Sequence, residues 1–288
     1  IEASPALHID VTVAAQHPAM QTQATLDQAP ASRVIGPPGI CPPPPRLEAV
    51  WARHADEVRE AQRLRYRVFA DEMGARLTPP PGTEPGLDVD RFDAHCEHLL
   101  VRCVETGEAP ARVVGTYRVM TGHAARQIGG FYSDDEFDLA RLDPLRAYMT
   151  ELGRSCTDAD WRSGAVILLL WSSLAEFMHR HRLDLMIGCA SVPMRDGGHW
   201  AASLWNSLRR THLAPAEERV NPRLALPVDS LRGDLEVEPP ALIKGYLKCG
   251  ATVLGPPSWD PDFGTADLPM MLKLAALPPS YRRRFLRA

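Results

Sequence analysis

The sequence predicts an α/β fold in which helices flank a mixed, partly antiparallel central sheet. Runs rich in β-branched residues occur at 98–104, 112–120 and 183–192, and they alternate with segments whose apolar residues recur at helical spacing. The resulting order is helix, β-hairpin, strand, helix, strand, helix. This order is typical of a sheet covered by helices and excludes a β-sandwich or a helical bundle.

Length and composition restrict the class of protein further. Of 288 residues, 45% are apolar and 24% are charged, which excludes collagenous, coiled-coil and wholly disordered chains. The longest strictly apolar run, 165–171, is much shorter than the roughly 20 residues that span a bilayer. A net charge of -4 argues against a nucleic-acid binder. Scattered cysteines without a CxxC pair, and first residues unlike a secretory signal, indicate a cytoplasmic protein.

The chain begins with a segment of unusual composition. Residues 1–45 are rich in Ala, Gln and Pro, so we expect a flexible leader ahead of a folded domain at 46–288. Apolar residues then recur at spacings of three and four from Leu47 to Val68. This spacing predicts an amphipathic helix at the start of the domain.

The remaining elements follow in order along the chain. A Pro- and Gly-rich loop leads to an antiparallel hairpin, and a strand, a helix, a second strand and a second helix come after it. These segments are the loop 78–88, the hairpin 98–104 with 112–120, the strand 148–156, the helix 165–181, the strand 183–192 and the helix 200–212. We expect a C-terminal helical extension from about residue 205.

The segment 150–164 contains the most informative chemistry. Glu151 and Arg154 would point to opposite faces of a regular strand, so both reach one site only if the strand bulges, which Gly153 permits. Backbone N–H groups freed by such a bulge could bind the oxyanion of a thioester under attack. Arg162 and Gly164 precede a helix, whose free N–H groups favour a phosphate. An ordinary helix start explains these two residues equally well.

Longer motifs resemble one family. ELGRSC at 151–156, WRSG at 161–164 and IGCAS at 187–191 are similar to the GNAT superfamily of N-acyltransferases, and especially to the ornithine N-acyltransferases of bacterial ornithine-lipid synthesis. The resemblance runs from about Leu47 to the end and implies a GNAT-like fold whose sheet has a V-shaped split. Further motifs are RLRYRVFADEMG at 63–74, GTYRVM at 115–120, GGFYSDDEFDL at 129–139, LIKGYLKCGA at 242–251 and DPDFGTADLPMML at 260–272.

The chain is also similar to acyl-homoserine-lactone synthases, which join acyl-carrier-protein thioesters to an amine. Their pattern is matched by Arg65, Phe69, Asp90, Asp93, Arg118, Phe131, Glu151 and Arg154. Two features depart from the patterns. DEMGARL at 71–77 lacks the usual Trp, and Thr157 to Asp160 stand where ornithine-type members often have a His-Pro pair.

This resemblance implies direct transfer in a ternary complex. The α-amine of ornithine attacks a 3-hydroxyacyl thioester on acyl carrier protein and gives lyso-ornithine lipid, with no tightly bound cofactor and no metal. Arg162 and Gly164 would bind the phosphopantetheine of the donor. The incoming ammonium must lose a proton, so Glu151 is the expected general base, assisted by Arg154. The alternative for Glu151 is a structural carboxylate paired with Arg154 or Arg118.

The other matched residues have two interpretations each. Asp90 and Asp93 either hold the cationic acceptor or cap a loop. Arg65, Arg118 and Arg154 either position the carboxylate of the acceptor or organise the protein's own carboxylates. Arg65 is the weakest of the three candidates, because it is expected on a helix, where single arginines are more often solvated. Phe131 either lines the acyl path or belongs to the core.

Two motifs suggest other chemistry. HCEH at 95–98 contains metal-ligand residue types, but neighbours in a strand alternate faces and no second ligand cluster follows, so we expect no metal. Cys156 could serve as a nucleophile, but no His forms a recognisable dyad with it. We therefore expect Cys156 to be a small packed residue.

The C-terminal tail, PPSYRRRFLRA at 278–288, combines four arginines with two aromatic rings. It suits the anionic inner face of the membrane or an acidic carrier protein, and a solvated end explains it equally well. Two other functions remain open. One is a related N-acyltransferase that uses another amino acid or makes an acyl-homoserine lactone, and the other is a non-catalytic acyl-carrier- or lipid-binding module.

Overall fold

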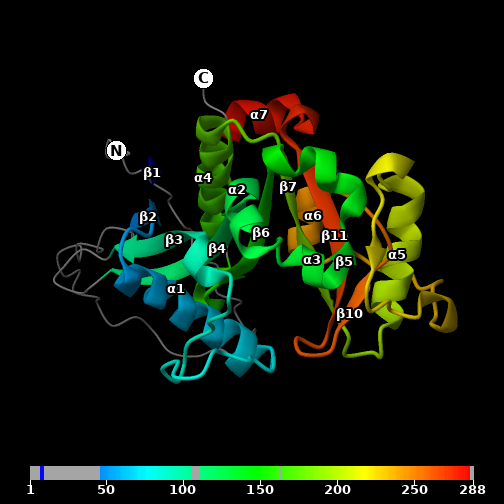
Figure 1. Cartoon of the computed structure of the whole chain (residues 1–288), viewed down its shortest axis with the longest axis horizontal. Helices are drawn as coiled ribbons and strands as arrows, with labels where there is room; N and C mark the ends of the chain where they lie inside the picture. Colours follow the sequence, from blue (N-terminus) through cyan, green and yellow to red (C-terminus); the bar gives the residue numbers. More distant parts are fainter. Residues whose placement is uncertain (1–6, 10–45, 105–110, 163, 286–288) are drawn as a thin grey trace, which may run out of the picture.

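A nine-stranded mixed sheet forms the centre of the protein (Figure 1). The computed structural model describes residues 7–9, 46–104, 111–162 and 164–285. The strand order is β1-β2-β3-β4-β6-β7-β11-β10, and β9 also pairs with β11. These strands are β1 Leu7–Ile9, β2 Arg46–Trp51, β3 Glu97–Val104, β4 Arg112–Thr121, β6 Met149–Thr157, β7 Leu185–Pro193, β9 Thr252–Val253, β10 Ser258–Asp260 and β11 Thr265–Lys273. A separate pair joins β5 (Phe137–Asp138) to β8 (Asn221–Pro222).

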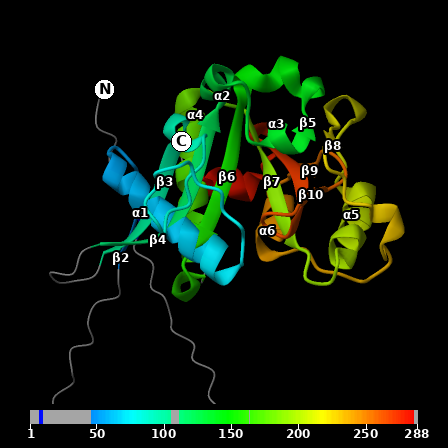
Figure 2. The same cartoon turned by 60° about the horizontal axis from the view of Figure 1, so that its bottom comes forward.

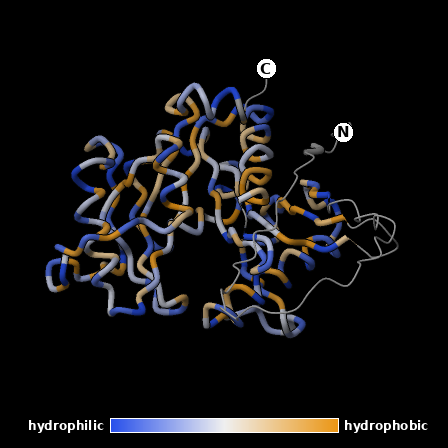
Figure 3. The backbone as a smooth tube through the Cα atoms, turned by 180° about the vertical axis from the view of Figure 1, so that it is seen from behind, coloured by the Kyte–Doolittle hydropathy of each residue, from blue (hydrophilic) through white to orange (hydrophobic). Residues whose placement is uncertain are grey.

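Helices cover both faces of the sheet. They are α1 Ala55–Tyr66, α2 Gly122–Ile128, α3 Ser133–Glu136, α4 Ala165–His181, α5 His199–Thr211, α6 Ala241–Lys248 and α7 Pro279–Phe285. On one face of β2–β4, Leu64 of α1 packs with Leu100, whereas Leu170 of α4 packs with Leu99 on the other. Successive residues of β3 and β4 therefore point to opposite faces, and most of them are buried because helices cover both faces. Figure 3 shows hydrophobic segments in the interior of the molecule.

Several sequence predictions are confirmed. The hairpin is β3 paired with β4, with Leu99 opposite Tyr117, and the strand 148–156, the helix 165–181, the strand 183–192 and the helix 200–212 correspond to β6, α4, β7 and α5. Gly115 of β4 allows α4 to approach closely, since a Cβ there would lie 2.3 Å from Val166 Cγ1. The α/β fold with a mixed sheet is therefore correct.

The prediction of a helix from Leu47 is wrong at its start. Residues 46–51 form β2, in which Leu47 and Ala49 are buried with the period of two that a strand requires. The helix α1 begins only at Ala55, where the Glu57 side chain reaches back to the backbone N–H of His54 in a capping box.

The C-terminal region is not the predicted helical extension. After α5 the chain forms loops, the short helices α6 and α7, and β11, which pairs with β7 over nine residues and completes the sheet. On α7, Phe285 is buried and packs edge-to-face on Trp171, and Tyr281 stacks on Phe285. These rings are used in packing, so they are not free to enter a bilayer.

The predicted leader lies largely outside the described residues. Leu7–Ile9 of this segment forms β1, which pairs antiparallel with β2, and residues 1–6 and 10–45 are not described. In the part that is described, none of the helices combines the length and the apolar character needed to cross a bilayer.

Candidate active site

The sheet divides between β6 and β7. These parallel strands pair only at Met149–Glu151 with Leu185–Ile187 and then diverge, as Figure 2 shows. The V-shaped split implied by the resemblance is therefore present. A cleft of about 190 Å³ opens between the diverging strands. This central cleft is lined by side chains from β4, β6, β7 and β11 and by residues of α6.

A bulge lies on the β6 wall of the cleft. Arg118 of β4 is opposite Gly153 and Thr116 is opposite Cys156, so two residues of β6 face Tyr117 alone. Arg154, the first of the two, has a φ of 49° in the left-handed region, which non-glycine residues rarely adopt. The bulge predicted from Gly153 is confirmed, and it brings both Glu151 and Arg154 to the cleft.

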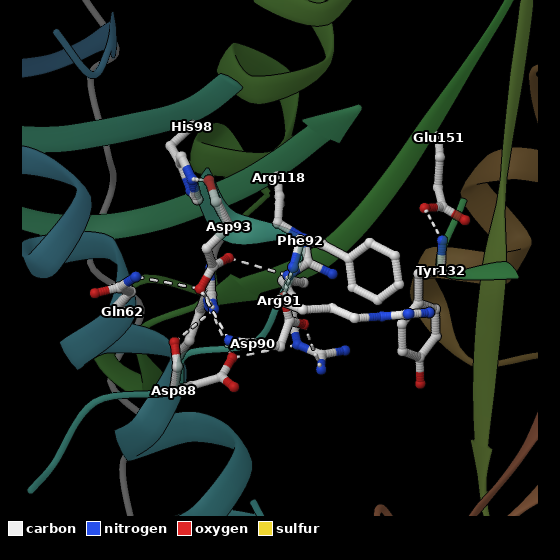
Figure 4. Close-up of polar contacts among 12 residues, drawn as sticks. Gln62, Asp88, Asp90, Arg91, Phe92, Asp93, His98, Arg118, Tyr132 and Glu151 are labelled. Atoms are coloured by element: carbon white, nitrogen blue, oxygen red, sulfur yellow. Dashed lines mark hydrogen bonds and ion pairs between the residues drawn. The ribbon is translucent and has the colours of Figure 1, made fainter. Parts of the chain in front are cut away.

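Glu151 is buried, and its carboxylate binds the chain that enters α3. Its oxygens accept hydrogen bonds from the backbone N–H of Tyr132 at 2.8 Å, which Figure 4 shows, and from the N–H and the hydroxyl of Ser133 at 2.7 and 2.5 Å. Burial raises the pKa of Glu151, whereas these donors oppose the rise. Among the described residues, Glu151 forms no ion pair with Arg118 or Arg154. The alternative role, a carboxylate paired with Arg154 or Arg118, is therefore not what these contacts show, because the segment at Tyr132 and Ser133 binds the carboxylate instead.

Three arginines and three aspartates form a buried ionic network beside the cleft, part of which is drawn in Figure 4. Arg65 is fully buried and donates to Asp88 at 2.7 Å and to both oxygens of Asp93 at 2.9 and 2.8 Å. Its proximity lowers the pKa of Asp93 although burial alone would raise it.

The other two arginines extend this network to the cleft wall. Arg118 donates to Asp90 at 2.6 Å and to Asp93 at 3.0 Å, and Arg154 donates to Asp90 at 3.1 Å. Arg154 also lies 3.3 Å from Asp88. Three guanidinium groups thus face three carboxylates, so the network fixes the segment 88–93 against β4 and β6.

Arg65 organises carboxylates, which is one of the two roles considered for the arginines. It is also the largest fully buried side chain in the described chain, so the solvated position that is usual for a single arginine on a helix does not apply. Asp88, its closest partner, was not selected from the sequence. The signal for it was the spacing of Asp88, Asp90 and Asp93 directly after the Pro/Gly loop.

The two predicted phenylalanines lie in different places. Phe69 belongs to a π-helical turn, Arg67–Glu72, that continues α1, and it borders the cleft in edge-to-face contact with Phe263. Phe131 is buried in another core cluster, with Arg146 over its ring, and does not line the central cleft. Its position corresponds to the core interpretation.

Arg162 and Gly164 lie at the start of α4 and are not among the residues that line the cleft. Gly164 is the N-cap of the helix with a φ of 86°, and Arg162 forms an ion pair with Glu72 and donates to the carbonyl of Thr157. The donor-binding role of these two residues stays a prediction.

Apolar space continues the cleft towards α4 and α7. Two cavities of about 50 and 40 Å³ follow it, and Leu152 and Tyr246 line the cleft and both cavities. The hydroxyls of Tyr117 and Tyr246 form a short hydrogen bond at the boundary, and Tyr117 also contacts Ser155. A pair of buried hydroxyls thus lies between the polar cleft and the apolar cavities.

Asp267 of β11 lies on the opposite wall of the cleft. Its buried carboxylate accepts hydrogen bonds from the hydroxyls of Thr265, at 2.9 Å, and Ser191. Burial raises the pKa of Asp267 to about 7. Sequence reasoning missed this residue, although an acidic side chain in the middle of the apolar strand TADLPMML is an available signal.

The other chemical motifs have structural roles. Cys156 is buried, and its burial raises the thiol pKa to about 12, which is unfavourable for a nucleophile and fits the packed residue that we expect. In HCEH, His95 is exposed, whereas His98 is buried against the carbonyl of Asp93 at 3.0 Å. Within the described ranges, the structure has no group of three His, Cys, Asp or Glu side chains that could hold a metal.

Comparisons with known proteins agree with this architecture. Residues 64–172 match the family model described as Acetyltransferase (GNAT) domain. The chain is 35% identical over 274 residues to an L-ornithine N(alpha)-acyltransferase of Rhizobium meliloti, covering 88% of this chain and 86% of the relative. It is also 35% identical over 253 residues to the protein of the same name from Rhodobacter capsulatus, covering 85% and 96%.

The matches among solved structures are more distant in sequence. The AHL synthase LasI matches with a TM-score of 0.48 and 12% identity, over 85% of this chain and 97% of that one. FeeM, an N-acyl amino acid synthase from uncultured soil microbes, matches with a TM-score of 0.48 and 14% identity, over 85% and 98%.

Proposed function

This chain belongs to the L-ornithine N(alpha)-acyltransferases, and we propose that it transfers a 3-hydroxyacyl group from acyl carrier protein to the α-amine of ornithine, giving lyso-ornithine lipid. It is an amide-forming acyltransferase. The observation that supports the full proposal is the split between β6 and β7, because it places a bulged strand, acidic groups and apolar cavities along one cleft.

The donor's acyl group occupies the cleft and the cavities behind it in this proposal. The thioester carbonyl lies beside the β6 bulge, where backbone N–H groups around Arg154 stabilise the oxyanion. The alkyl chain extends past Leu152 into apolar space. The hydroxyls of Tyr117 and Tyr246 give a 3-hydroxyl group a partner where apolar lining alone would offer none.

The carrier's phosphopantetheine binds at the start of α4 in the same proposal. Gly164 exposes the first N–H groups of a 17-residue helix, whose positive end favours a phosphate, and Arg162 adds a guanidinium. The reaction needs no tightly bound cofactor, because the substrates supply both the nucleophile and the activated carbonyl.

The acceptor enters the polar end of the cleft. Asp90 and Asp93 are both bound by arginines, so their contribution is to fix Arg118 and Arg154 on the cleft wall. Arg154, with 12% of its side chain exposed, is the group proposed to attract the acceptor's carboxylate. The amine attacks the thioester carbon, a C–N bond forms, the C–S bond breaks, and the carrier thiol leaves.

A mass-spectrometric assay tests the proposed function directly. The protein is incubated with 3-hydroxyacyl carrier protein, or with the coenzyme A thioester, and with ornithine, lysine or glutamine. We expect an N-acyl product that depends on ornithine and forms fastest with the carrier-protein donor. No product with any amino acid, together with tight binding of the acylated carrier, would instead indicate a binding module.

Cytoplasmic location with peripheral contact at the anionic inner membrane face is also proposed, since the product is an amphiphile. Arg282 and Arg283 of α7 support it, because they are exposed beside the packed rings of Tyr281 and Phe285. Replacing Arg282 and Arg283 by Glu should abolish salt-sensitive cosedimentation with anionic vesicles and leave the apolar packing intact. If wild type fails to sediment with such vesicles at low salt, the membrane contact is refuted.

A further inference from the structure

We propose that Asp267, rather than Glu151, is the general base that takes the proton from the α-ammonium group of the acceptor. This inference rests on the proposed function and names a catalytic residue for it. Both carboxylates line the central cleft, Glu151 on β6 and Asp267 on β11. The groups that each carboxylate already binds, and the charges around it, decide which of the two can take the proton.

Glu151 is occupied by structural donors. Its Oε1 accepts from the Ser133 N–H and hydroxyl, and its Oε2 accepts from the Tyr132 N–H. A proton on this carboxyl would disrupt bonds that hold the chain entering α3 against β6. We therefore assign Glu151 a positioning role, since it fixes Tyr132, whose side chain forms part of the cleft lining.

Asp267 is bound by hydroxyl groups that can change their hydrogen-bond partners. Its partners are the hydroxyls of Thr265 and Ser191, and a hydroxyl can rotate to donate elsewhere or to accept from a protonated carboxyl. Ser191 itself lines the cleft on β7. An ammonium group that enters from the cleft can thus replace one of these donors without breaking the backbone structure.

The charges around Asp267 favour a cation. It faces Asp260 of β10 and Glu136 of α3, and the thiol of Cys189 and the phenol of Tyr132 also interact with it. Across the cleft lie Glu151 and the guanidinium of Arg154, which is bound to the network of aspartates. No ion pair found in the described part of the chain includes Glu136, Asp260 or Asp267.

This wall of the cleft is therefore acidic without a protein cation to neutralise it. An ammonium group supplies the missing positive charge when it binds. Burial, with the neighbouring Asp260 and Glu136 adding to it, raises the pKa of Asp267 to about 7. A base is most effective when its pKa lies near the working pH, so this carboxyl is suited to accept the proton.

The Asp267 carboxylate takes one proton from the ammonium and becomes a carboxylic acid, which leaves a neutral amine with a free electron pair. That pair forms the C–N bond to the thioester carbon, and the second proton lost from nitrogen passes to the departing sulfur as the C–S bond breaks. Asp267 then releases its proton to solvent. The products are an amide, a thiol and one proton.

Asp267→Asn and Glu151→Gln form the matched pair of variants. With ornithine, we expect Asp267→Asn to lower kcat by 10²- to 10⁴-fold, the range of general-base contributions, with similar binding of the acyl carrier. We expect the wild-type kcat/KM profile to have an acidic limb that rises towards pH 7, and this limb should disappear in the variant. Glu151→Gln should retain the limb, although its rate can fall.

A weakly basic acceptor separates catalysis from structure. Hydroxylamine is largely uncharged at neutral pH and needs no base before attack, so wild type and Asp267→Asn should acylate it at rates within about threefold. A merely structural role would depress both reactions equally. If Asp267→Asn raises KM alone, or if only Glu151→Gln loses the acidic limb, Asp267 is not the base.

Ser191→Ala provides a test that keeps the carboxylate. Removing this donor takes away a hydrogen bond that favours the ionised form, so the acidic limb should move to higher pH. An unmoved limb in a folded Ser191→Ala protein would overturn the proposal even if Asp267→Asn does not fold. If wild type makes no N-acyl product with any acceptor, the proposed function has failed instead.

Discussion

Replacing Asp267 by Asn should stabilise the protein relative to wild type, and this difference in the free energy of unfolding should increase as the pH rises. In the folded state this carboxyl has a pKa of about 7, against an ordinary value of 3.8. Between these values the folded state keeps a proton that the unfolded chain has lost, so the free energy of unfolding of wild type falls with rising pH. Above pH 7 the loss is complete and is on the order of 4 kcal/mol. The Asn side chain does not titrate, so the variant does not undergo this loss of stability.

Urea unfolding at pH 5, 6, 7 and 8 measures this difference. The free energies of unfolding of the variant and wild type should diverge steadily up to pH 7 and then run parallel. Asp262→Asn is the control, because Asp262 is half-exposed in an ion pair with Arg76 and should change stability by less than about 1 kcal/mol at every pH. If the free energies of unfolding of wild type and Asp267→Asn change in parallel from pH 5 to 8, the reasoning is refuted and the assignment of the base is weakened.

Three other substitutions test the network and the cavities. Arg65→Met leaves Asp88 and Asp93 buried without their main cation, so urea unfolding should show that the free energy of unfolding falls by about 3–5 kcal/mol. The control Arg63→Met changes an exposed side chain and should lower it by under about 1 kcal/mol. Equal effects of the two substitutions would contradict the role of the network. Leu152→Trp fills the apolar cavities and should reduce kcat/KM for long acyl donors at least tenfold while sparing acetyl transfer. Tyr246→Phe should reduce the preference for 3-hydroxyacyl over plain acyl donors about tenfold, and an unchanged ratio would remove the hydroxyl pair from the proposal.

Local features of the fold could be predicted from the sequence. The hairpin, α4 and the β6 bulge depend on neighbouring residues, such as Gly153 between Glu151 and Arg154. The strand β2 could not be distinguished from a helix, because Leu47 and Trp51 fit spacings of both two and four. Its partner β3 decides the matter, and that partner lies about fifty residues further along the chain.

The parts of the site that were missed depend on contacts between distant segments. Arg65 is buried because Asp88 and Asp93, 23 and 28 residues later, supply opposite charges. Asp267 enters the cleft only because β11 pairs antiparallel with β7, which places it opposite Ser191. Neither spacing nor periodicity contains these relations, so a charged residue in the interior could be recognised as unusual without its partner being identified.

The charges are paired on one wall of the cleft and unpaired on the other, and this difference would orient the proposed amino acid acceptor. On the β6 side, Arg154 and its neighbouring arginines are matched by aspartates, so the wall is held rigid and has little net charge. On the β11 side, Asp267 and Asp260 take part in no ion pair among the residues that the structure describes. An amino acid acceptor therefore gains most by turning its ammonium towards β11 and its carboxylate towards Arg154. In the proposed arrangement, that orientation brings the amine to the carboxylate proposed to deprotonate it and leaves the bulge to the thioester carbonyl.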